Sequence, residues 1–555
     1  MQRLQTISWR KLLKQTLLVL AAVFLLSLSL AAGGWWHLAK GNFSSSSTLL
    51  KLASPVSLIA SRVTLGQISL VETWYQAVWL GRWLSEWQLA AGGELAPQLE
   101  TLDSEISTVT PHFQQLAIHF QRSWLLAVLV PNHQRIAEQL AAMEQFLVVT
   151  ERLLTSDDRF LLLLQNTDEL RATGGFIGSY AVLDFSLPNP FELEVRDIYD
   201  PSGVSFSLLS PAGQARYLSE GAGMKLHDAN WSPDFPTSAQ LILRYFANIQ
   251  GDPQVYDGVV AVPLSVIEDL VAAVGGLYLP DQGRTITADE FAEVIRQDRQ
   301  DFFPGSRQKQ QSLQQVYTAL WLRFTQLTAE EWRVLLGRLA VGQLTSELQF
   351  YAKQPTLQQQ LEQLGLAGIT QAYGPQQLFV FPVESNVGIN KANRKVSRSL
   401  ALALDDQHLL TVTTQFQNHY TVAERPAEQS TNPFYAAAGH LGYANYYRLL
   451  VRSDMRVRNI TLNGQPLDSW DEEIVVSVGG VSYLQVGFLI TLPEEERLTA
   501  QVQFSVPAAV AETFIIQKQV GLEYDEAIIA CANGSIIRPL LARNLYQASC
   551  NQQVE

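Results

Sequence analysis

The sequence predicts a central α/β domain, preceded by a transmembrane helix and a helical stalk and followed by an all-β, sandwich-like domain. Three observations predict this arrangement. An uncharged apolar stretch lies near the N-terminus, apolar runs of strand length alternate with helical patterns in the middle, and segments with a period of two residues follow residue 378. With 555 residues, the chain is also too long for a single hydrophobic core.

The N-terminal residues predict the topology. Residues 1–14 carry four basic residues and no acidic one, and the uncharged residues 15–39 include a stretch long enough to cross a bilayer as a helix. Because a basic flank stays in the cytoplasm, we expect a cytoplasmic tail at residues 1–14, a transmembrane helix at 15–39 and the bulk of the chain outside the cytoplasmic membrane. Ser29 and Ala31 leave open a cleaved signal peptide, which places the bulk outside as well.

Residues 40–156 are predicted to form a helical stalk. Trp79, Trp83 and Trp87 recur every four residues, and residues 136–154 form an amphipathic pattern. The indole stripe suits either a grip on a membrane or sugar face or the packed seam of a helical bundle, and the seam is the commoner use. Prolines are expected to separate the helical segments: Pro97, Pro111 and Pro131.

Residues 157–325 alternate strand and helix patterns, which is typical of an α/β domain. Strands are expected at 160–164, 176–185 and 258–262, and helices at 238–249 and 264–274. Residues 326–377, rich in Gln and Leu, are predicted to form a helical connector.

Residues 378–555 are predicted to form a β-sandwich, because short segments of period two alternate with turn residues. The expected strands lie at 399–404, 409–415, 447–451, 473–478, 484–490 and 499–504. Cys531 and Cys550 are the two cysteines of the chain. Outside the cytoplasm they would be able to form a disulfide worth roughly 3 kcal/mol, and two separate thiols are the alternative.

The segment from Leu161 to Tyr180 carries the main candidate site. Four consecutive leucines predict a buried strand, and polar residues and two glycines follow where this strand ends. Glycine permits backbone conformations closed to other residues. The candidate residues of this segment are Asn166, Asp168, Glu169, Arg171, Gly174 and Gly175.

Three stretches carry a family resemblance. Gln165–Ser179 (QNTDELRATGGFIGS), Asn230–Pro236 (NWSPDFP) and Tyr256–Val262 (YDGVVAV) resemble a bacterial domain-of-unknown-function family, number four thousand and twelve. Asn386–Asn393 (NVGINKAN) resembles a stretch that follows the signature domain in that family, which implies that the β-rich domain belongs to the family architecture. The family name implies no activity.

A more distant resemblance involves Val255–Gly276 and residues 286–311, which are similar in order and spacing to the LytR-CpsA-Psr family. Its members have one N-terminal span and move glycopolymers from a polyprenyl-pyrophosphate carrier to the cell wall, using arginines and a magnesium-binding aspartate. The chain departs from the family's Gly-x-Asp turn and Arg-Ser-Asp-Thr stretch, so the fold can remain while the activity is altered or lost.

The LytR-CpsA-Psr resemblance implies roles for individual residues. Asp168 would bind Mg²⁺, and Asp168, Arg171 and Arg307 would be catalytic. Guanidinium groups suit a pyrophosphate because they make bidentate contacts, although ordinary arginines on a solvated helix face are the alternative. The implied substrate-binding residues are Asn166, Glu169, Gly174, Gly175, Arg296, Arg299 and Gln308.

Several functions find no support. A net charge of −14 argues against a nucleic-acid partner. The sequence contains no Gly-x-Ser-x-Gly elbow, phosphate-binding P-loop or His-Glu-x-x-His pair. Asp168 and Glu169 are adjacent and should point apart, which argues against a glycosidase.

Two functions remain as expectations. The first is a membrane-anchored cell-envelope protein that binds, and as an enzyme would transfer, a polyprenyl-pyrophosphate-linked glycopolymer to a cell-wall acceptor outside the cytoplasmic membrane. The alternative is a noncatalytic surface or scaffold protein that uses the same fold to hold wall or protein partners. In the first case Arg171, Arg296 and Arg307 should face one apolar cleft, and in the second they should scatter.

Overall fold

The computed structural model describes residues 48–51, 95–122, 133–187, 193–199, 208–218, 223–251, 255–280, 283–291, 307–324, 326–327, 331, 347–424, 441–508, 510, 513–531, 533–539, 541 and 545–550. The predicted cytoplasmic tail, the predicted transmembrane helix, the tryptophan stripe, Arg296 and Arg299 lie outside these residues. The chain divides into two compact units. Unit 1 comprises residues 1–157, 187–189 and 321–340, and unit 2 comprises residues 158–186, 190–320 and 341–555.

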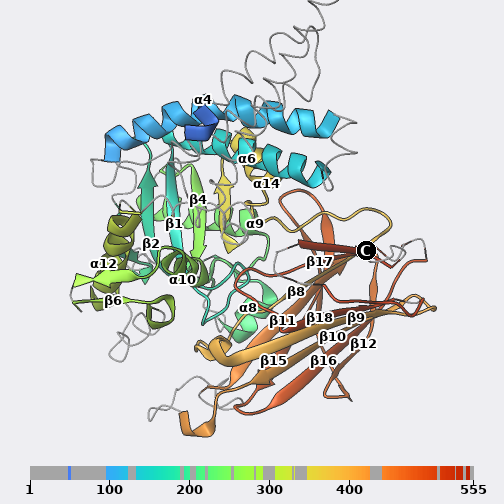
Figure 1. The fold of residues 1–555 in the computed structure, drawn as a ribbon. Coiled ribbons are helices and arrows are strands. Elements are labelled where there is room, and N and C mark those ends of the chain that lie inside the picture. Colours follow the sequence, from blue (N-terminus) through green and yellow to red (C-terminus); the bar gives the residue numbers. More distant parts are fainter. Residues whose placement is uncertain are drawn as a thin grey trace, which may run out of the picture. The chain divides into compact units, whose positions relative to one another are not determined.

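Unit 1 contains the helical region predicted from the sequence. Helices α4 (Leu95–Arg122) and α6 (His133–Leu154) pack against each other (Figure 1). The expectation that Pro111 separates two helical segments is wrong, because α4 continues through it. A proline removes one helical hydrogen bond. The apolar side chains on both sides of it, Val109 and Phe113, compensate by packing in a cluster against α6.

Among the helices that the structure describes, none is both long enough and apolar enough to cross a bilayer.

Unit 2 begins with a five-stranded mixed sheet in the order β3-β2-β1-β4-β7. β1 pairs in parallel with β4 and antiparallel with β2, and the three lie side by side (Figure 1). The three strands predicted in this region are present as β1, β2 and β4. Most of their apolar side chains are buried, as the apolar runs of the sequence predict. The strand bounds are β1 Arg159–Asn166, β2 Phe176–Asp184, β3 Arg196–Asp197, β4 Gly258–Pro263 and β7 Gln349–Ala352.

The two helices predicted in this part of the chain are present, but the predicted helical connector, residues 326–377, contains a strand. α9 (Phe235–Gln250) and α10 (Leu264–Ala273) match two predicted helices, and Ala239 and Ile242 of α9 are buried with side chains of β1 and β4. Residues 326–377 are not helical throughout, because β7 completes the sheet beside β4 and its side chains are largely buried. The other elements are α8 Ala212–Tyr217, η1 Leu226–Asp228, β5 Leu277–Leu279, β6 Arg284–Ile286, α12 Arg307–Phe324 and α14 Pro355–Gln363.

The C-terminal part of unit 2 is β-rich, as predicted. It contains a seven-stranded sheet, β13-β12-β16-β10-β9-β18-β19, and a six-stranded sheet, β14-β15-β11-β8-β17-β20. Side chains of both sheets meet in one hydrophobic cluster, for example Val412 of β10 and Leu449 of β11. We call residues 377–550 the two-sheet domain.

The strands of the two-sheet domain contain or overlap all six segments predicted from the period-two pattern. Their bounds are β8 Gln377–Val383, β9 Val396–Leu404, β10 Leu409–Asn418, β11 Tyr443–Arg452, β12 Arg456–Leu462, β13 Gln465–Pro466, β14 Asp471–Val476, β15 Ser482–Leu492, β16 Arg497–Ser505, β17 Thr513–Gln517, β18 Glu526–Ala530, β19 Ile536–Ile537 and β20 Leu545–Ser549. The short 3-10 turns there are η4 Ala392–Lys395 and η5 Val422–Glu424.

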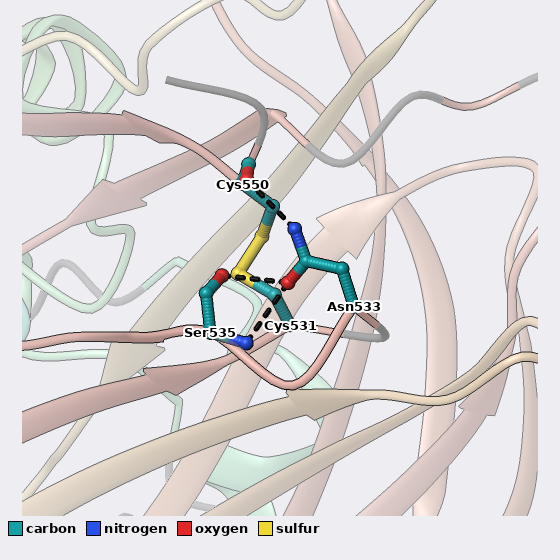
Figure 2. The surroundings of a disulfide bond; sticks show 4 residues. All are labelled: Cys531, Asn533, Ser535 and Cys550. Carbon is teal, nitrogen blue, oxygen red and sulfur yellow. Dashed lines mark hydrogen bonds between the residues drawn. A yellow bond between two sulfur atoms is a disulfide. The ribbon is translucent and has the colours of Figure 1, made fainter. Parts of the chain in front are cut away.

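A disulfide joins the two sheets of this domain. Cys531 directly follows β18 of the seven-stranded sheet and Cys550 directly follows β20 of the six-stranded sheet, and their sulfur atoms are bonded (Figure 2). The Asn533 side chain donates a hydrogen bond to the Cys550 carbonyl oxygen at 3.0 Å and accepts one from the Ser535 amide at 2.9 Å. Both cysteines are buried in the shared hydrophobic cluster, so the bond closes one side of this core.

Candidate functional site

The candidate residues of the sequence lie in the loop between β1 and β2, Asn166–Gly175, which we call the signature loop. Asn166 shapes its first turn: its side-chain oxygen accepts the Asp168 amide at 3.2 Å, and its carbonyl oxygen accepts the Glu169 amide at 3.1 Å. An asparagine side chain stabilises such turns by imitating a backbone carbonyl. The Arg171 carbonyl accepts the Gly174 amide at 3.0 Å and closes the next turn.

Glycine is required at both positions of the Gly174-Gly175 pair. Gly174 has φ +120°, a conformation that residues with a side chain rarely adopt. A Cβ atom on Gly175 would lie 2.4 Å from the carbonyl carbon and oxygen of Asn166, closer than non-bonded atoms approach. The pair therefore lets the loop fold back on the end of β1.

Arg171 lies at the centre of the loop and is only 1% exposed. Its Nη2 donates to Oε1 of Glu169 at 3.0 Å and to Oδ1 of Asp228 at 3.4 Å. Its Nη1 donates to the Asn386 carbonyl at 2.7 Å and the Leu170 carbonyl at 3.3 Å. Four acceptors of the protein thus engage the two terminal nitrogens of this guanidinium.

The two carboxylates beside Arg171 have different acidities. Burial raises the pKa of Glu169, and the opposing effect of Arg171 does not compensate for it. Burial would also raise the pKa of Asp228, but His227 and Arg171 together outweigh it and hold this pKa below its usual value. Nε2 of His227 lies 3.3 Å from Oδ2 of Asp228. The charged form is therefore favoured at Asp228 and disfavoured at Glu169.

The backbone of the signature loop bonds to the two-sheet domain. The Leu170 carbonyl accepts the Asn386 amide at 2.9 Å, and the Leu170 amide donates to Oδ1 of Asn393 at 3.2 Å. Nε2 of Gln519 donates to the Arg171 carbonyl at 2.7 Å and to the Glu384 carbonyl at 3.0 Å. We call this contact region the junction.

The second stretch of the resemblance, residues 230–236, also lies in the junction. Nδ2 of Asn230 donates to Oγ1 of Thr173 at 3.0 Å and to the Gly175 carbonyl at 2.8 Å, which fixes the end of the signature loop. Asp234 precedes α9, and its carboxylate accepts the amides of Thr370 at 2.9 Å and Val478 at 3.2 Å. The stretch therefore connects the five-stranded sheet with the two-sheet domain.

A second buried arginine, Arg448 of β11, completes the junction. It is 1% exposed, and it donates to the Trp231 carbonyl at 2.9 Å and to Oγ of Ser385 at 2.9 Å. Its guanidinium carbon lies 4.6 Å from the centre of the Trp231 ring, within the range of a cation–π contact. No ion pair among the described residues includes Arg448, and burial lowers its pKa to about 10.

The other predicted arginines and Gln308 cannot be compared in position with Arg171, because their side chains belong to the part of the chain that the structure does not describe. Arg296 and Arg299 lie outside the described residues, and so do the side chains of Arg307 and Gln308, which begin α12. Arg171 itself faces the junction. The catalytic and substrate-binding roles of these residues stay predictions.

Asp168, the predicted Mg²⁺ ligand, is buried in the signature loop. Among the described residues, no three His, Cys, Asp or Glu side chains form a group that could hold a metal ion. The acidic side chains bonded to Arg171 are Glu169 and Asp228. The role of Asp168 as a Mg²⁺ ligand therefore stays a prediction.

Arg448, Gln519 and Asp228 are not among the site residues predicted from the sequence. One signal was available for Arg448: it is a charged residue inside the otherwise uncharged stretch YANYYRLLV of a predicted strand. Asn386–Asn393 was recognised by its resemblance alone, and it supplies two partners of the signature loop.

Comparison with known families agrees with these features. Residues 156–299 match a family described as "Protein of unknown function (DUF4012)". The matched residues include the signature loop, residues 230–236 and β4. No curated protein matches the chain. The chain therefore carries a domain of the DUF4012 family, as its QNTDELRATGGFIGS and NWSPDFP stretches predict.

Proposed function

We propose that the chain is a noncatalytic protein of the cell envelope, anchored in the cytoplasmic membrane, whose unit 2 is a rigid scaffold for wall or protein partners outside that membrane. The observation that carries this proposal is the state of Arg171. Its guanidinium is 1% exposed and bonds to Glu169, Asp228 and the Asn386 carbonyl.

A pyrophosphate-binding arginine needs free donors that point at the ligand. For Arg171 to serve this role, its bonds to Glu169 and Asp228 would have to break, leaving two buried carboxylates without their cation. Breaking a buried ion pair in this way costs about 3–5 kcal/mol. This cost supports a structural role for Arg171 over a role in catalysis.

The contacts across the junction support a rigid scaffold. Three buried residues make hydrogen bonds across the junction. Arg448 donates to the Trp231 carbonyl, the Asp234 carboxylate accepts the Val478 amide, and Gln519 donates to the Arg171 carbonyl. Buried hydrogen bonds of this kind favour one arrangement of the parts, because a displacement leaves desolvated groups without partners. The two-sheet domain would thus be held at a fixed angle to the five-stranded sheet.

The proposed location rests on the N-terminal residues and on the disulfide. Basic residues before an apolar stretch favour an anchored chain with its bulk outside. The Cys531–Cys550 bond fits this location, since disulfides persist in oxidising compartments and are rare in the cytosol.

The function is tested by lipid binding of the purified full chain. We expect no saturable binding of polyprenyl pyrophosphate by the wild type, normal thermal stability for Arg307→Ala, and a lowered melting temperature for Arg171→Met. Saturable binding by the wild type that disappears in Arg307→Ala, with an unchanged melting temperature, would support the transferase instead.

The location is tested by thiol alkylation of protein denatured directly from cells of a bacterial host, because both cysteines are buried in the folded domain. We expect Cys531 and Cys550 to react with a maleimide only after reduction, and a Cys531→Ser, Cys550→Ser double variant to show no labelling under either condition. Labelling of the wild type without reduction would contradict the oxidising location.

A further inference from the structure

β20 is an end strand of the six-stranded sheet. It pairs antiparallel with β17 along its whole length, and no described strand pairs with its other edge. Cys550 directly follows β20 and is bonded to Cys531, which directly follows β18 of the seven-stranded sheet (Figure 2). A covalent bond to the opposite sheet is therefore part of what holds this strand.

The strand itself contributes little to the hydrophobic core. Ala548 is its one buried residue, Tyr546 is partly buried against the core, and Leu545 is 44% exposed. In contrast, four of the five residues of β17 are buried, and β17 has a strand on both sides. Because burial of apolar surface supplies most of the stability of a strand, β20 is the weakly held member of this pair.

The disulfide compensates for this small burial. Without it, the ladder with β17 and the bond from Nδ2 of Asn533 to the Cys550 carbonyl at 3.0 Å would still favour the paired state. The two cysteines are 19 residues apart in the sequence, and closing a loop of this length favours the ordered state by roughly 100-fold. The bond is therefore expected to decide how often β20 separates from β17.

We propose that β20 is a redox-controlled latch, which opens from β17 about 100-fold more often once a dithiol has reduced the Cys531–Cys550 bond. In this exchange the bond between the two cysteine sulfur atoms breaks and the two sulfur atoms of the reductant become bonded to each other. The two protons of the dithiol pass to Cys531 and Cys550, so both cysteines become thiols.

Opening of the latch would change the surface of the sheet. It would leave β17 as an end strand whose backbone groups on one side have lost their partners, and such an edge can pair with another strand. The exposed edge would belong to an apolar strand, since Phe514, Ile515 and Ile516 are all buried in the closed state. The intact disulfide thus keeps this edge covered.

The latch is independent of the scaffold proposal, because it rests only on strand pairing and burial within the two-sheet domain. It also predicts a difference between the two thiols of the reduced chain. Cys550 would leave the core together with β20, whereas Cys531 would stay at the end of β18, which lies between β9 and β19.

The first test compares amide hydrogen exchange of the full chain before and after reduction by dithiothreitol. We expect the amides of β20 to exchange about 100-fold faster in the reduced chain. β14, the other end strand of the same sheet, is the matched control and should exchange equally in both states. Unchanged exchange of β20 would overturn the proposal. An equal acceleration in β11 and β15 would overturn it as well, because the disulfide would then stabilise the whole domain.

A variant separates the loss of the bond from other effects of the reductant. Cys550→Ala removes the disulfide, and we expect the same fast exchange of β20 without dithiothreitol. Wild-type exchange in β11 and β14 would show that the variant is folded. Slow exchange of β20 in this folded variant would contradict the latch.

The second test is alkylation of the reduced and folded full chain by iodoacetamide, after removal of the dithiothreitol. We expect Cys550 to react about tenfold faster than Cys531 or more, because opening of β20 exposes only the first. Mass spectrometry of the two cysteine peptides measures both rates. Equal rates, or a faster reaction of Cys531, would overturn the proposal.

Discussion

The junction contains two fully buried arginines, and the protein accommodates them in opposite ways. Arg171 bonds to two carboxylates, Glu169 and Asp228. Arg448 bonds to the Trp231 carbonyl and the Ser385 hydroxyl and stacks on the Trp231 ring. The difference lies in what each arginine would leave behind: two buried carboxyl groups, of which Asp228 favours its charged form, in the first case, and only neutral groups in the second.

The largest effect is expected from Arg171→Met. This variant leaves Glu169 and Asp228 buried without their cation, and we expect the free energy of unfolding to fall by about 3–5 kcal/mol. Urea titration followed by circular dichroism measures it. A loss no larger than that of Arg448→Met would remove the distinction between the two arginines.

Asp228→Asn should have the next largest effect, a loss of about 2–3 kcal/mol at pH 7, because the charged form of this group is the favoured one. Since its pKa is held below the usual 3.8, its contribution is present above that pH and disappears as the pH falls through the lowered pKa. The difference between the wild type and Asp228→Asn should therefore shrink below pH 3.8. A difference that stays constant down to acid unfolding would rule out this charge effect.

Arg448→Met should cost about 1–2 kcal/mol, because it removes hydrogen bonds to neutral acceptors and leaves no charge unpaired. The loss should also be the same from pH 5 to 8, since a pKa of about 10 keeps this arginine charged throughout. The same urea titrations, repeated at several pH values, test both statements. A loss that changes across this range would reveal an anionic partner of Arg448.

Glu169→Gln should have the smallest effect, within about 1 kcal/mol at pH 7. Its carboxyl has a raised pKa, so the folded protein binds the proton more tightly and loses stability as the pH rises from the usual 4.5 through the raised value. The Gln variant lacks this loss and should gain on the wild type over that range. If it instead costs more than Asp228→Asn at pH 7, then Glu169 is the main counterion of Arg171.

Much of the fold could be predicted from local patterns. The leucine run 161–164 forms the buried strand β1, and period-two segments such as 409–415 become strands of the two-sheet domain. β7 was missed because four residues within a Gln- and Leu-rich region give too short a pattern to distinguish a strand from a helix. Its conformation is decided by its pairing with β4.

The candidate site could be located but not interpreted. The polar turn after β1 and its two glycines were recognised, and the structure places them in one buried loop. The partners that determine the state of Arg171 are Asp228, 57 residues later, and Asn386, 215 residues later. Spacing along the chain carries no information on such distant pairs. The sequence therefore led us to predict an accessible, ligand-binding arginine where the structure has a buried ionic network.

The bond from Gln519 to the Arg171 carbonyl also sets an order of events during synthesis. Gln519 follows Arg171 by 348 residues, so at 5–20 residues per second it emerges roughly 20–70 s later. Until then, the signature loop has to leave this carbonyl to water or to another partner. Such a long closure is entropically costly and slow. The matched segment, residues 156–299, therefore contains only some of the partners of its own loop, and its final folding step has to wait until Gln519 has been synthesised.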